Sequence, residues 1–357
     1  MKSPLFLLGA AAACAAMTTS TRPAARPQDL APKNATLTAV AGIKVGHHTL
    51  TERPTGCTVV LVEKGAVGGV DVRGAAPGTR ETDLLNPVNT VERVQAIVLS
   101  GGSAFGLDTA TGVMRYLEER GIGYPTGVIP VPIVPAAILF DLGVGGNPRI
   151  RPTADCGYRA ATAATDGAVA EGNVGAGAGA TIGKLGGPGR GMKAGIGTAS
   201  FTTPDGTVIA ALVAVNALGD VIDPETGQVV AGVRTPDGKH LADARKLLRS
   251  PDFKPPTGHP ANTTIGVVAT NARLTKAQAT KLAQMAQDGL ARALYPAHTT
   301  VDGDTIFALA TGERRDAGDV LTLGVFAADV VAQAIVRAAR QATGIPGYPA
   351  ARDMERK

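Results

Sequence analysis

The sequence predicts an α+β fold in which sheets and helices pack as layers, and three patterns support this prediction. Short apolar, β-branched runs come in pairs around tight turns, as hairpins do. Longer stretches repeat apolar residues at helical spacing. The 357 residues include 46 glycines and are 44% apolar, which indicates tight turns and close backbone contacts. Hairpins combined with several helices favour a layered sandwich over a doubly wound parallel sheet.

From Leu37 onward, the first half of the chain alternates between strand and helix patterns. "CTVVLV" (57–62) and "AIVLS" (96–100) predict short buried strands. The glycine turn "GGSAFG" follows, and "LDTATGVMRYLEERG" predicts an amphipathic helix ending at Gly121. A second helix is expected over "YRAATAATDGAVAEG" (158–172), although its threonines weaken the pattern.

Two hairpins are expected next. "AGIGTASFTT" and "TVIAALVAVN" flank the turn "PDG" (204–206), and "DVID" and "QVVAG" flank "PETG" (224–227). A proline-rich polar connector then leads to "TTIGVVAT" (263–270), which has the β-branched apolar composition of a buried strand. "DGDTIFALAT" (302–311) predicts another strand.

Two long helices are expected in the last third of the chain. "LTKAQATKLAQMAQDGLARAL" opens with a capping box, Thr275 to Gln278. The other helix covers about 320–342; it carries Asp329 and Gln333, so it is expected to be a buried helix and not a membrane span. The apolar stripe of the first helix comprises Leu282, Met285, Ala286, Leu290 and Ala293.

The N-terminus has the pattern of an export signal. Lys2 precedes an apolar run to Ala13 that is too short to span a membrane, which predicts a signal peptide over 1–17. Residues 18–36 predict a disordered tether, and 37–357 a single domain. Periplasmic or envelope location is expected, with a possible lipid on Cys14 because "GAAAAC" loosely resembles a lipoprotein box. A mispredicted start codon ahead of a cytosolic protein is the alternative.

The composition excludes several function classes. Aromatic residues make up 3%, tryptophan is absent, and the net charge of +5 is scattered, so no nucleic-acid partner is expected. Cys57 and Cys156 could pair after export, but separate buried thiols are the favoured interpretation. Without CxxC, HExxH or a histidine cluster, no metal and no cofactor is expected.

Three familiar motifs fail on inspection. "GAGAGATIGKL" lacks the first glycine and the final Ser or Thr of a phosphate loop. "SGGSAFG" lacks the closing glycine of a nucleophile elbow. A dinucleotide fingerprint fails because no acidic residue ends a second strand at the right distance.

The junction Asn262–Thr263, where the polar connector meets the strand, carries possible chemistry. A threonine hydroxyl is a weak nucleophile, but an N-terminal threonine has its own base in the free α-amine. Thr263 becomes N-terminal if its hydroxyl attacks the carbonyl of Asn262 and water opens the resulting ester. An ordinary loop-to-strand junction is the alternative interpretation of these residues.

Seven blocks of sequence, in order between about 37 and 344, resemble the DmpA-type aminopeptidases. That family includes β-peptidyl aminopeptidases and nylon-oligomer endohydrolases. The resemblance implies a four-layer αββα sandwich, similar to N-terminal-nucleophile hydrolases but with different connectivity, and a precursor that cuts itself into a large and a small chain. The blocks are "GHHTLTERPTGCTVVL", "LSGGSAFGLDTATGVMRYLEERG", "VPIVPAAILFDLG", "GAGAGATIGKLGG", "ALVAVNALGDVID", "ANTTIGVVATNARLTKAQATKLAQMAQDGLARAL" and "HTTVDGDTIFALATG".

The resemblance also implies roles for particular residues. Thr263 matches the nucleophile, and Asp302 and Asp304 match the acidic pair that orients it. Asn216 matches a residue that helps to hold the oxyanion, and Lys184 matches a lysine near the nucleophile of the nylon-oligomer enzymes. Without the resemblance, the aspartates and Asn216 could equally be turn formers, and the lysine could be solvated.

Three further residues are weaker candidates for substrate contact. Phe140 stands where the nylon-oligomer enzymes have a tyrosine, which puts a nylon-type substrate in doubt. Gly102 and Ser103 open a helix, so their N–H groups could face the substrate, or the loop could serve packing.

The function expected is that of a self-processed amidase or aminopeptidase that cuts beside a free amino end, assembled as a tetramer of two-chain units. The alternatives are an endo-acting hydrolase of 6-aminohexanoate-type oligomers, an acyltransferase and a non-enzymatic envelope binding protein.

Overall fold

A nine-stranded sheet organises the protein, with strands in the order β10-β11-β14-β16-β2-β4-β7-β3 and β1 paired with β2. The computed structural model describes residues 1, 34–254, 262–314 and 318–354. The strands are β1 (Lys44–Thr49), β2 (Gly56–Val72), β3 (Thr79–Arg80), β4 (Arg93–Ser100), β5 (Tyr124–Pro125), β6 (Pro130–Val131), β7 (Ala136–Ile138), β8 (Thr181–Ile182), β9 (Met192–Lys193), β10 (Ile196–Thr202), β11 (Val208–Asn216), β12 (Asp220–Ile222), β13 (Val229–Ala231), β14 (Thr263–Thr270), β15 (Leu294–Tyr295) and β16 (Thr305–Ala310).

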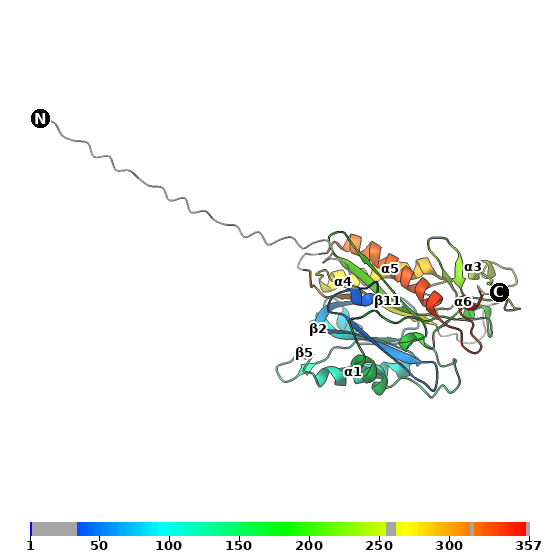
Figure 1. Cartoon of the computed structure of the whole chain (residues 1–357), viewed down its shortest axis with the longest axis horizontal. Coiled ribbons are helices and arrows are strands. Elements are labelled where there is room, and N and C mark those ends of the chain that lie inside the picture. Colours follow the sequence, from blue (N-terminus) through cyan, green and yellow to red (C-terminus); the bar gives the residue numbers. More distant parts are fainter. Residues whose placement is uncertain (2–33, 255–261, 315–317, 355–357) are drawn as a thin grey trace. The chain divides into compact units, whose positions relative to one another are not determined.

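Helices cover the sheet and connect its strands. The α-helices are α1 (Thr109–Glu118), α2 (Ala154–Thr162), α3 (Ala244–Leu247), α4 (Lys276–Ala293), α5 (Val320–Gln341) and α6 (Ala351–Met354). The 3-10 helices are η2 (Leu37–Ala39), η3 (Asp83–Leu85), η4 (Ser103–Asp108), η5 (Gly175–Gly177) and η6 (Lys184–Gly186). In Figure 1 the pair α4 and α5 lies above the strands and α1 below them.

Three apolar clusters divide the domain into four layers. One cluster joins α4 and α5 to β10, β11 and β16. A second lies between strands, where Val60 and Leu99 meet Leu212, Val267 and Phe307. The third joins β2 and β4 to α1 and α2. The pairing of β2 with β4 shifts between Leu61 and Ala66, so one long strand takes part in both strand layers. The αββα arrangement is therefore confirmed.

The predicted hairpins and the long helices are confirmed. β10 pairs antiparallel with β11, and β12 with β13. Thr275 and Gln278 form both hydrogen bonds of the capping box at the start of α4. On its stripe Met285 is only partly buried, while the other four predicted residues are fully buried.

The structure corrects two expectations. The helix predicted over 158–172 runs from Ala154 to Thr162 instead, so its first turn was missed and its second half is not helical. Thr165 leaves the helix to form a β-bridge with Val45. The interpretation of Cys57 and Cys156 as separate thiols is also wrong, because the two form a disulfide between β2 and α2.

Helix α5 is long and apolar enough to cross a membrane by composition, and among the described residues no other helix meets that test. Its core-facing residues pack against the sheet, as expected for a buried helix. The predicted signal peptide and Cys14 lie outside the described residues. At the end of the predicted tether, the Asn34 side chain accepts hydrogen bonds from the N–H and hydroxyl of Thr36, which is itself buried.

Candidate active site

The junction singled out in the sequence lies at the centre of the nine-stranded sheet. Thr263 is the first residue of β14, which pairs antiparallel with β11 and parallel with β16. Asn216, the last residue of β11, is directly opposite Thr263. Asp302 and Asp304 immediately precede β16 on the other side. Neighbouring inner strands therefore bring four of the predicted residues together where these strands begin or end.

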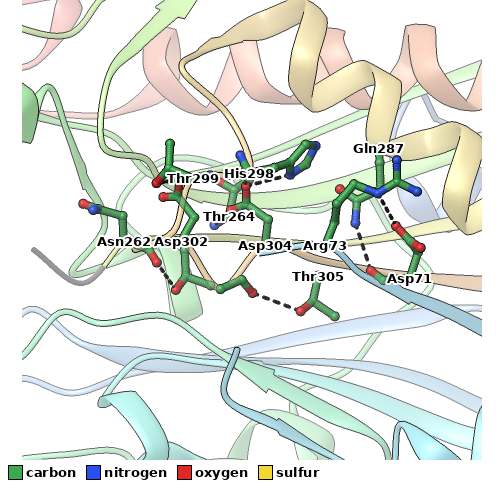
Figure 2. A network of polar contacts seen from close by, with 12 residues as sticks. Asp71, Arg73, Asn262, Thr264, Gln287, His298, Thr299, Asp302, Asp304 and Thr305 are labelled. Atoms are coloured by element: carbon green, nitrogen blue, oxygen red, sulfur yellow. Dashed lines mark hydrogen bonds and ion pairs between the residues drawn. The ribbon is translucent and has the colours of Figure 1, made fainter. Parts of the chain in front are cut away.

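The hydrogen-bond ladder between β14 and β16 is interrupted at the junction. Asn262 and Asp302 form an isolated parallel bridge, and regular pairing resumes at Ile265 and Thr305. Between these points, the N–H of Thr264 donates to the carboxylate of Asp304 at 2.7 Å, and the hydroxyl of Thr305 donates to the carbonyl of Gly303 at 3.0 Å. Side chains thus replace part of the ladder around the Asn262–Thr263 bond (Figure 2).

The Thr263 hydroxyl contacts the peptide bond that precedes it. It donates a short hydrogen bond to the carbonyl oxygen of Asn262. The same oxygen accepts the N–H of Gly303 at 3.0 Å. Thr263 is 3% exposed and Asn262 is 1% exposed. The nucleophile predicted from the sequence is therefore buried beside the carbonyl that it would have to attack.

The two aspartates are held by different donors, although both are almost fully buried. Asp302 accepts from the N–H of Thr299 at 2.8 Å and from its hydroxyl. Asp304 accepts the N–H of Thr264 on one oxygen and, on the other, the N–H and Nδ1 of His298, each at 3.0 Å. These donors allow two carboxylates to lie side by side.

Burial and the charge of Asp304 raise the pKa of Asp302 above its ordinary value, while the Thr299 hydrogen bonds and the Lys184 charge oppose that shift. A carboxyl with a raised pKa keeps its proton at a higher pH than usual. Asp302 is therefore suited to exchange a proton at the site.

Asn216 connects the predicted lysine to the strand opposite Thr263. Its side-chain oxygen accepts from Nζ of Lys184 at 2.7 Å and from the N–H of Thr181 at 3.1 Å. Its side-chain nitrogen donates to the carbonyl of Phe140 at 3.0 Å. Lys184, Asn216 and Phe140, distant in sequence, therefore belong to one hydrogen-bonded group.

Burial lowers the pKa of Lys184 to about 7, in spite of the negative charges on Asp302 and Asp141. At neutral pH a substantial fraction of this amine is unprotonated, and an unprotonated amine can accept a proton. The site thus contains a carboxyl with a raised pKa and an amine with a lowered one.

Gly102 and Ser103 use their N–H groups within the fold. The N–H of Gly102 donates to Asp141 at 2.9 Å, and that of Ser103 donates to the carbonyl of Leu139 at 3.0 Å. Asp141 is fully buried and forms an ion pair with Arg53 at 2.9 Å. These contacts favour the packing interpretation of the loop, because both N–H groups already have acceptors.

Sequence reasoning missed three side chains that support the site. Thr299 could have been found from its spacing of three residues before Asp302, which resembles a capping motif. His298 is the first residue of the block "HTTVDGDTIFALATG", but no role was predicted for it; its backbone adopts a left-handed conformation with φ 55°. Lys193 is fully buried and donates to the carbonyls of Gly177 and Ala180 at 2.9 Å each, just before Thr181.

Comparison with known families decides the class of this protein. The model of peptidase family S58 matches residues 35–352. The chain belongs to peptidase family S58. Members of a peptidase family hydrolyse peptide bonds, and this chain is accordingly an aminopeptidase-type amidohydrolase. The DmpA-type resemblance found in the sequence is thereby confirmed.

The relatives of this chain carry two kinds of name. An uncharacterized aminopeptidase of Mycobacterium tuberculosis is 46% identical over 349 residues, covering 89% of this chain and 97% of the relative. A 6-aminohexanoate-oligomer endohydrolase of Kocuria sp. is 30% identical over 314 residues, covering 84% of both chains.

Solved structures share the fold. The L-aminopeptidase D-Ala-esterase/amidase of Ochrobactrum anthropi, described as a variant of the Ntn hydrolase fold, matches 93% of this chain and 96% of its own with a TM-score of 0.66 and 22% identity. A β-aminopeptidase of Burkholderia sp. matches 90% of this chain and 93% of its own with a TM-score of 0.62 and 24% identity. Within the described residues, no group of three or more His, Cys, Asp or Glu is arranged to hold a metal ion.

Proposed function

We propose that this S58 peptidase cuts its own Asn262–Thr263 bond and that the freed Thr263 then hydrolyses an amide bond beside the free amino end of a substrate. The observation that carries the proposal is the contact between the Thr263 hydroxyl and the carbonyl oxygen of Asn262. The proposed attack joins this hydroxyl oxygen to the carbon of the same carbonyl group. The interrupted ladder supports the proposal, because it leaves this bond outside the regular strand pairing.

Self-cleavage transfers one acyl group twice. Oγ1 of Thr263 bonds to the carbonyl carbon of Asn262, the C–N bond breaks, and the hydroxyl proton ends on the released amine. Water then adds to the ester, the C–O bond breaks, Oγ1 regains a proton, and Asn262 leaves as a carboxylate. Lys184, whose pKa is about 7, and Asp302, whose pKa is raised, are the groups proposed to move these protons.

The cut enzyme repeats this chemistry on a substrate. The free α-amine of Thr263 acts as the base for its own hydroxyl, which attacks the substrate carbonyl to form an acyl-enzyme. Water releases the acyl group. The uncut chain supports this order of events, since Asn262, Thr263, Asp302 and Asp304 are each at most 3% exposed. A substrate gains access to the hydroxyl only after Asn262 has moved away.

N-terminal sequencing of the purified protein tests the proposal. Two pieces are expected, with the small one beginning at Thr263. Thr263→Ala should remain one inactive chain, and Thr263→Ser should still cut itself because it keeps a hydroxyl. Thr264→Val is the matched control: in the described part of the chain the Thr264 hydroxyl has no hydrogen-bond partner, and its N–H contact to Asp304 survives the change. A small piece that begins at Thr264, or an intact chain with full activity, contradicts the proposal.

A second candidate is endo-hydrolysis of 6-aminohexanoate-type oligomers. The 30% identity to the Kocuria endohydrolase over most of both chains favours it. Phe140 weighs against it, because its side chain offers no hydroxyl at the position of the expected tyrosine.

Matched substrates with free and blocked amino ends separate the candidates: an aminopeptidase requires the free end, whereas an endo-acting enzyme cuts both. An acyltransferase would depend on an added acceptor amine. The binding-protein alternative finds no support in a peptidase family.

We also propose that the protein is exported to the periplasm or cell envelope and that a lipid is attached to Cys14. The disulfide between Cys57 and Cys156 supports export, because disulfides persist in oxidising compartments. Cell fractionation with mass determination of the N-terminus tests it. Cytosolic protein that keeps Met1 contradicts it.

We further propose a tetramer of two-chain units. Exposed apolar side chains on two surfaces support assembly: Val128 and Ile129 between β5 and β6, and Leu321 and Val325 on α5. Light scattering tests it, since a mass equal to one two-chain unit at micromolar concentration contradicts it.

A further inference from the structure

The peptide N–H of Gly303 is the group that carries a further inference, and it was not among the residues predicted from the sequence. It donates to the carbonyl oxygen of Asn262 at 3.0 Å. We propose that this N–H is the oxyanion donor of self-cleavage: it stabilises the negative charge that forms on this oxygen when Thr263 attacks. The inference rests on the proposed self-cleavage and assigns a catalytic group to it.

The attack changes the charge on one atom. When Oγ1 of Thr263 bonds to the carbonyl carbon of Asn262, the C=O electron pair moves to the oxygen, which becomes an alkoxide until the C–N bond breaks and restores the carbonyl. A fixed N–H already within hydrogen-bond distance strengthens its bond as this charge grows. Gly303 is placed to act at that moment, because its acceptor in the uncut chain is the reacting oxygen itself.

The turn that presents this N–H is fixed by the segment that follows β2. The N–H groups of Arg73 and Gly74 donate to the carbonyl of Asp304 at 2.9 and 3.1 Å, and the N–H of Ala76 donates to the carbonyl of Asp302 at 2.8 Å. Both carbonyls flank Gly303 (Figure 2 shows Asp302, Asp304 and Arg73). A donor held in this way needs little reorganisation during the reaction.

Residue 303 has no room for a side chain. A Cβ atom there would lie 2.6 Å from the carbonyl oxygen of Ala76 and 2.9 Å from Oγ1 of Thr263. At Gly74 a Cβ atom would lie 2.3 Å from both the carbonyl oxygen of Asp302 and the nitrogen of Asp304. Two glycines therefore permit the backbone to approach the nucleophile this closely.

The side chain of Asn216 is directed elsewhere in the uncut chain. Its nitrogen donates to Phe140 at 3.0 Å, and its oxygen accepts from Lys184 and Thr181. The two oxyanion tasks are thereby divided: Gly303 serves self-cleavage, and Asn216 remains the group predicted for the substrate step.

Replacing the Gly303 residue by glycolic acid tests the assignment. Cell-free translation with a suppressor tRNA changes the peptide N–H to an ester oxygen and adds no atoms. Self-cleavage of the full chain should slow by about 100- to 1000-fold, as for the loss of one oxyanion donor, and full-length protein should persist on a denaturing gel. The matched control is glycolic acid at Gly206, whose N–H donates to the carbonyl of Thr203 at 2.9 Å in the turn after β10. Its cleavage rate should equal that of the unmodified chain.

The outcomes separate the assignment from the proposed function. If the unmodified chain cuts before Thr263 and the glycolate-303 chain cuts equally fast, the role of Gly303 is wrong and self-cleavage stands. If the unmodified chain does not cut, both fall.

A second measurement does not depend on folding of the ester variant. In uncut Thr263→Ala protein, NMR should show slow exchange of the Gly303 amide proton, and exchange should be faster in the cut enzyme, where Asn262 has left. Exchange at the unprotected rate in the uncut protein overturns the assignment.

Discussion

At the scale of single residues, Asp302 and Asp304 are the two buried carboxylates beside Thr263. Asp304→Ala removes the acceptor of both Thr264 and His298, so turnover of the cut fraction should fall by roughly 100-fold or more, as for a lost positioned base system. Substrate binding should change less, because the defect lies in the chemical step. Steady-state kinetics measures kcat and KM. Asp205→Ala, at an exposed turn, is the control. Full activity of Asp304→Ala would mean that this aspartate only forms the turn and has no role in catalysis.

His298 should act through Asp304. Its left-handed backbone is tolerated by asparagine and glycine, so His298→Asn and His298→Gly differ mainly in the side-chain donor. We expect kcat to fall about tenfold in the glycine variant, as for the loss of one hydrogen bond, and to recover in part in the asparagine variant, with KM little changed. His240→Gly, at an exposed position, controls for loss of an imidazole. Equal kcat in the asparagine and glycine variants would contradict a role of the His298 side chain in positioning Asp304.

The lowered pKa of Lys184 makes stability depend on pH. Burial lowers the pKa values of Lys184 and Lys193 to about 7, from 10.5. Between these values the unfolded chain binds more protons than the folded one, so the free energy of unfolding rises with pH from about 7 toward 10. In uncut Thr263→Ala protein, Lys184→Met should reduce that slope by up to about 1.4 kcal/mol per pH unit. Urea unfolding at pH 7, 8 and 9 measures this slope, and an unchanged slope in Lys184→Met would contradict a lowered pKa of Lys184.

At the residue scale, the sequence predicts candidate residues that lie in local patterns, but it does not predict contacts between residues far apart in the chain. The Asn-Thr-Thr junction and the Asp-Gly-Asp turn are local patterns. The buried pair Arg53–Asp141 depends on the assembled fold, because 88 residues separate its members. His298 lies only six residues before Asp304, but its contact depends on a left-handed backbone that the sequence does not mark. An isolated histidine or lysine carries no periodicity that would mark it.

At the scale of elements, hairpins and capped helices were predictable because their determinants are local. Thr275 and Gln278 define the start of α4 within four residues. The length of β2 could not be predicted, since the six-residue run 57–62 gives no sign that a strand of 17 residues bends between two layers. The parallel pairing of β14 with β16 likewise joins segments separated by a long helix.

The disulfide between β2 and α2 links two elements, and its contribution to the stability of the fold can be measured. It closes a loop with a sequence separation of 99, and its two residues lie within the cluster below the sheet. Loss of such a link typically costs about 2–5 kcal/mol. Cys57→Ala/Cys156→Ala should therefore lower the urea midpoint, and reductant should destabilise the wild type but leave the double variant unchanged. Equal midpoints with and without reductant would contradict this.

At the scale of the whole molecule, the proposed cut divides the sheet in an unusual place. β14, β16, α4 and α5 all follow Thr263 in the chain. Within the sheet, β14 is paired with β11 and β16 with β2, so the small chain supplies two central strands between partners from the large chain. The two chains cannot separate without breaking the centre of the sheet.

Because of this division, we expect the protein to fold efficiently only before the proposed cut. The precursor brings its halves together within one molecule, whereas two separated chains must find each other by diffusion. Recovery after urea should therefore depend on protein concentration for the cut enzyme and be independent of it for uncut Thr263→Ala protein, as circular dichroism at several dilutions would measure. Identical, concentration-independent recovery would contradict this. The uncut precursor is therefore the form that assembles the fold, and after the proposed cut the enzyme should persist through the slowness of its own unfolding.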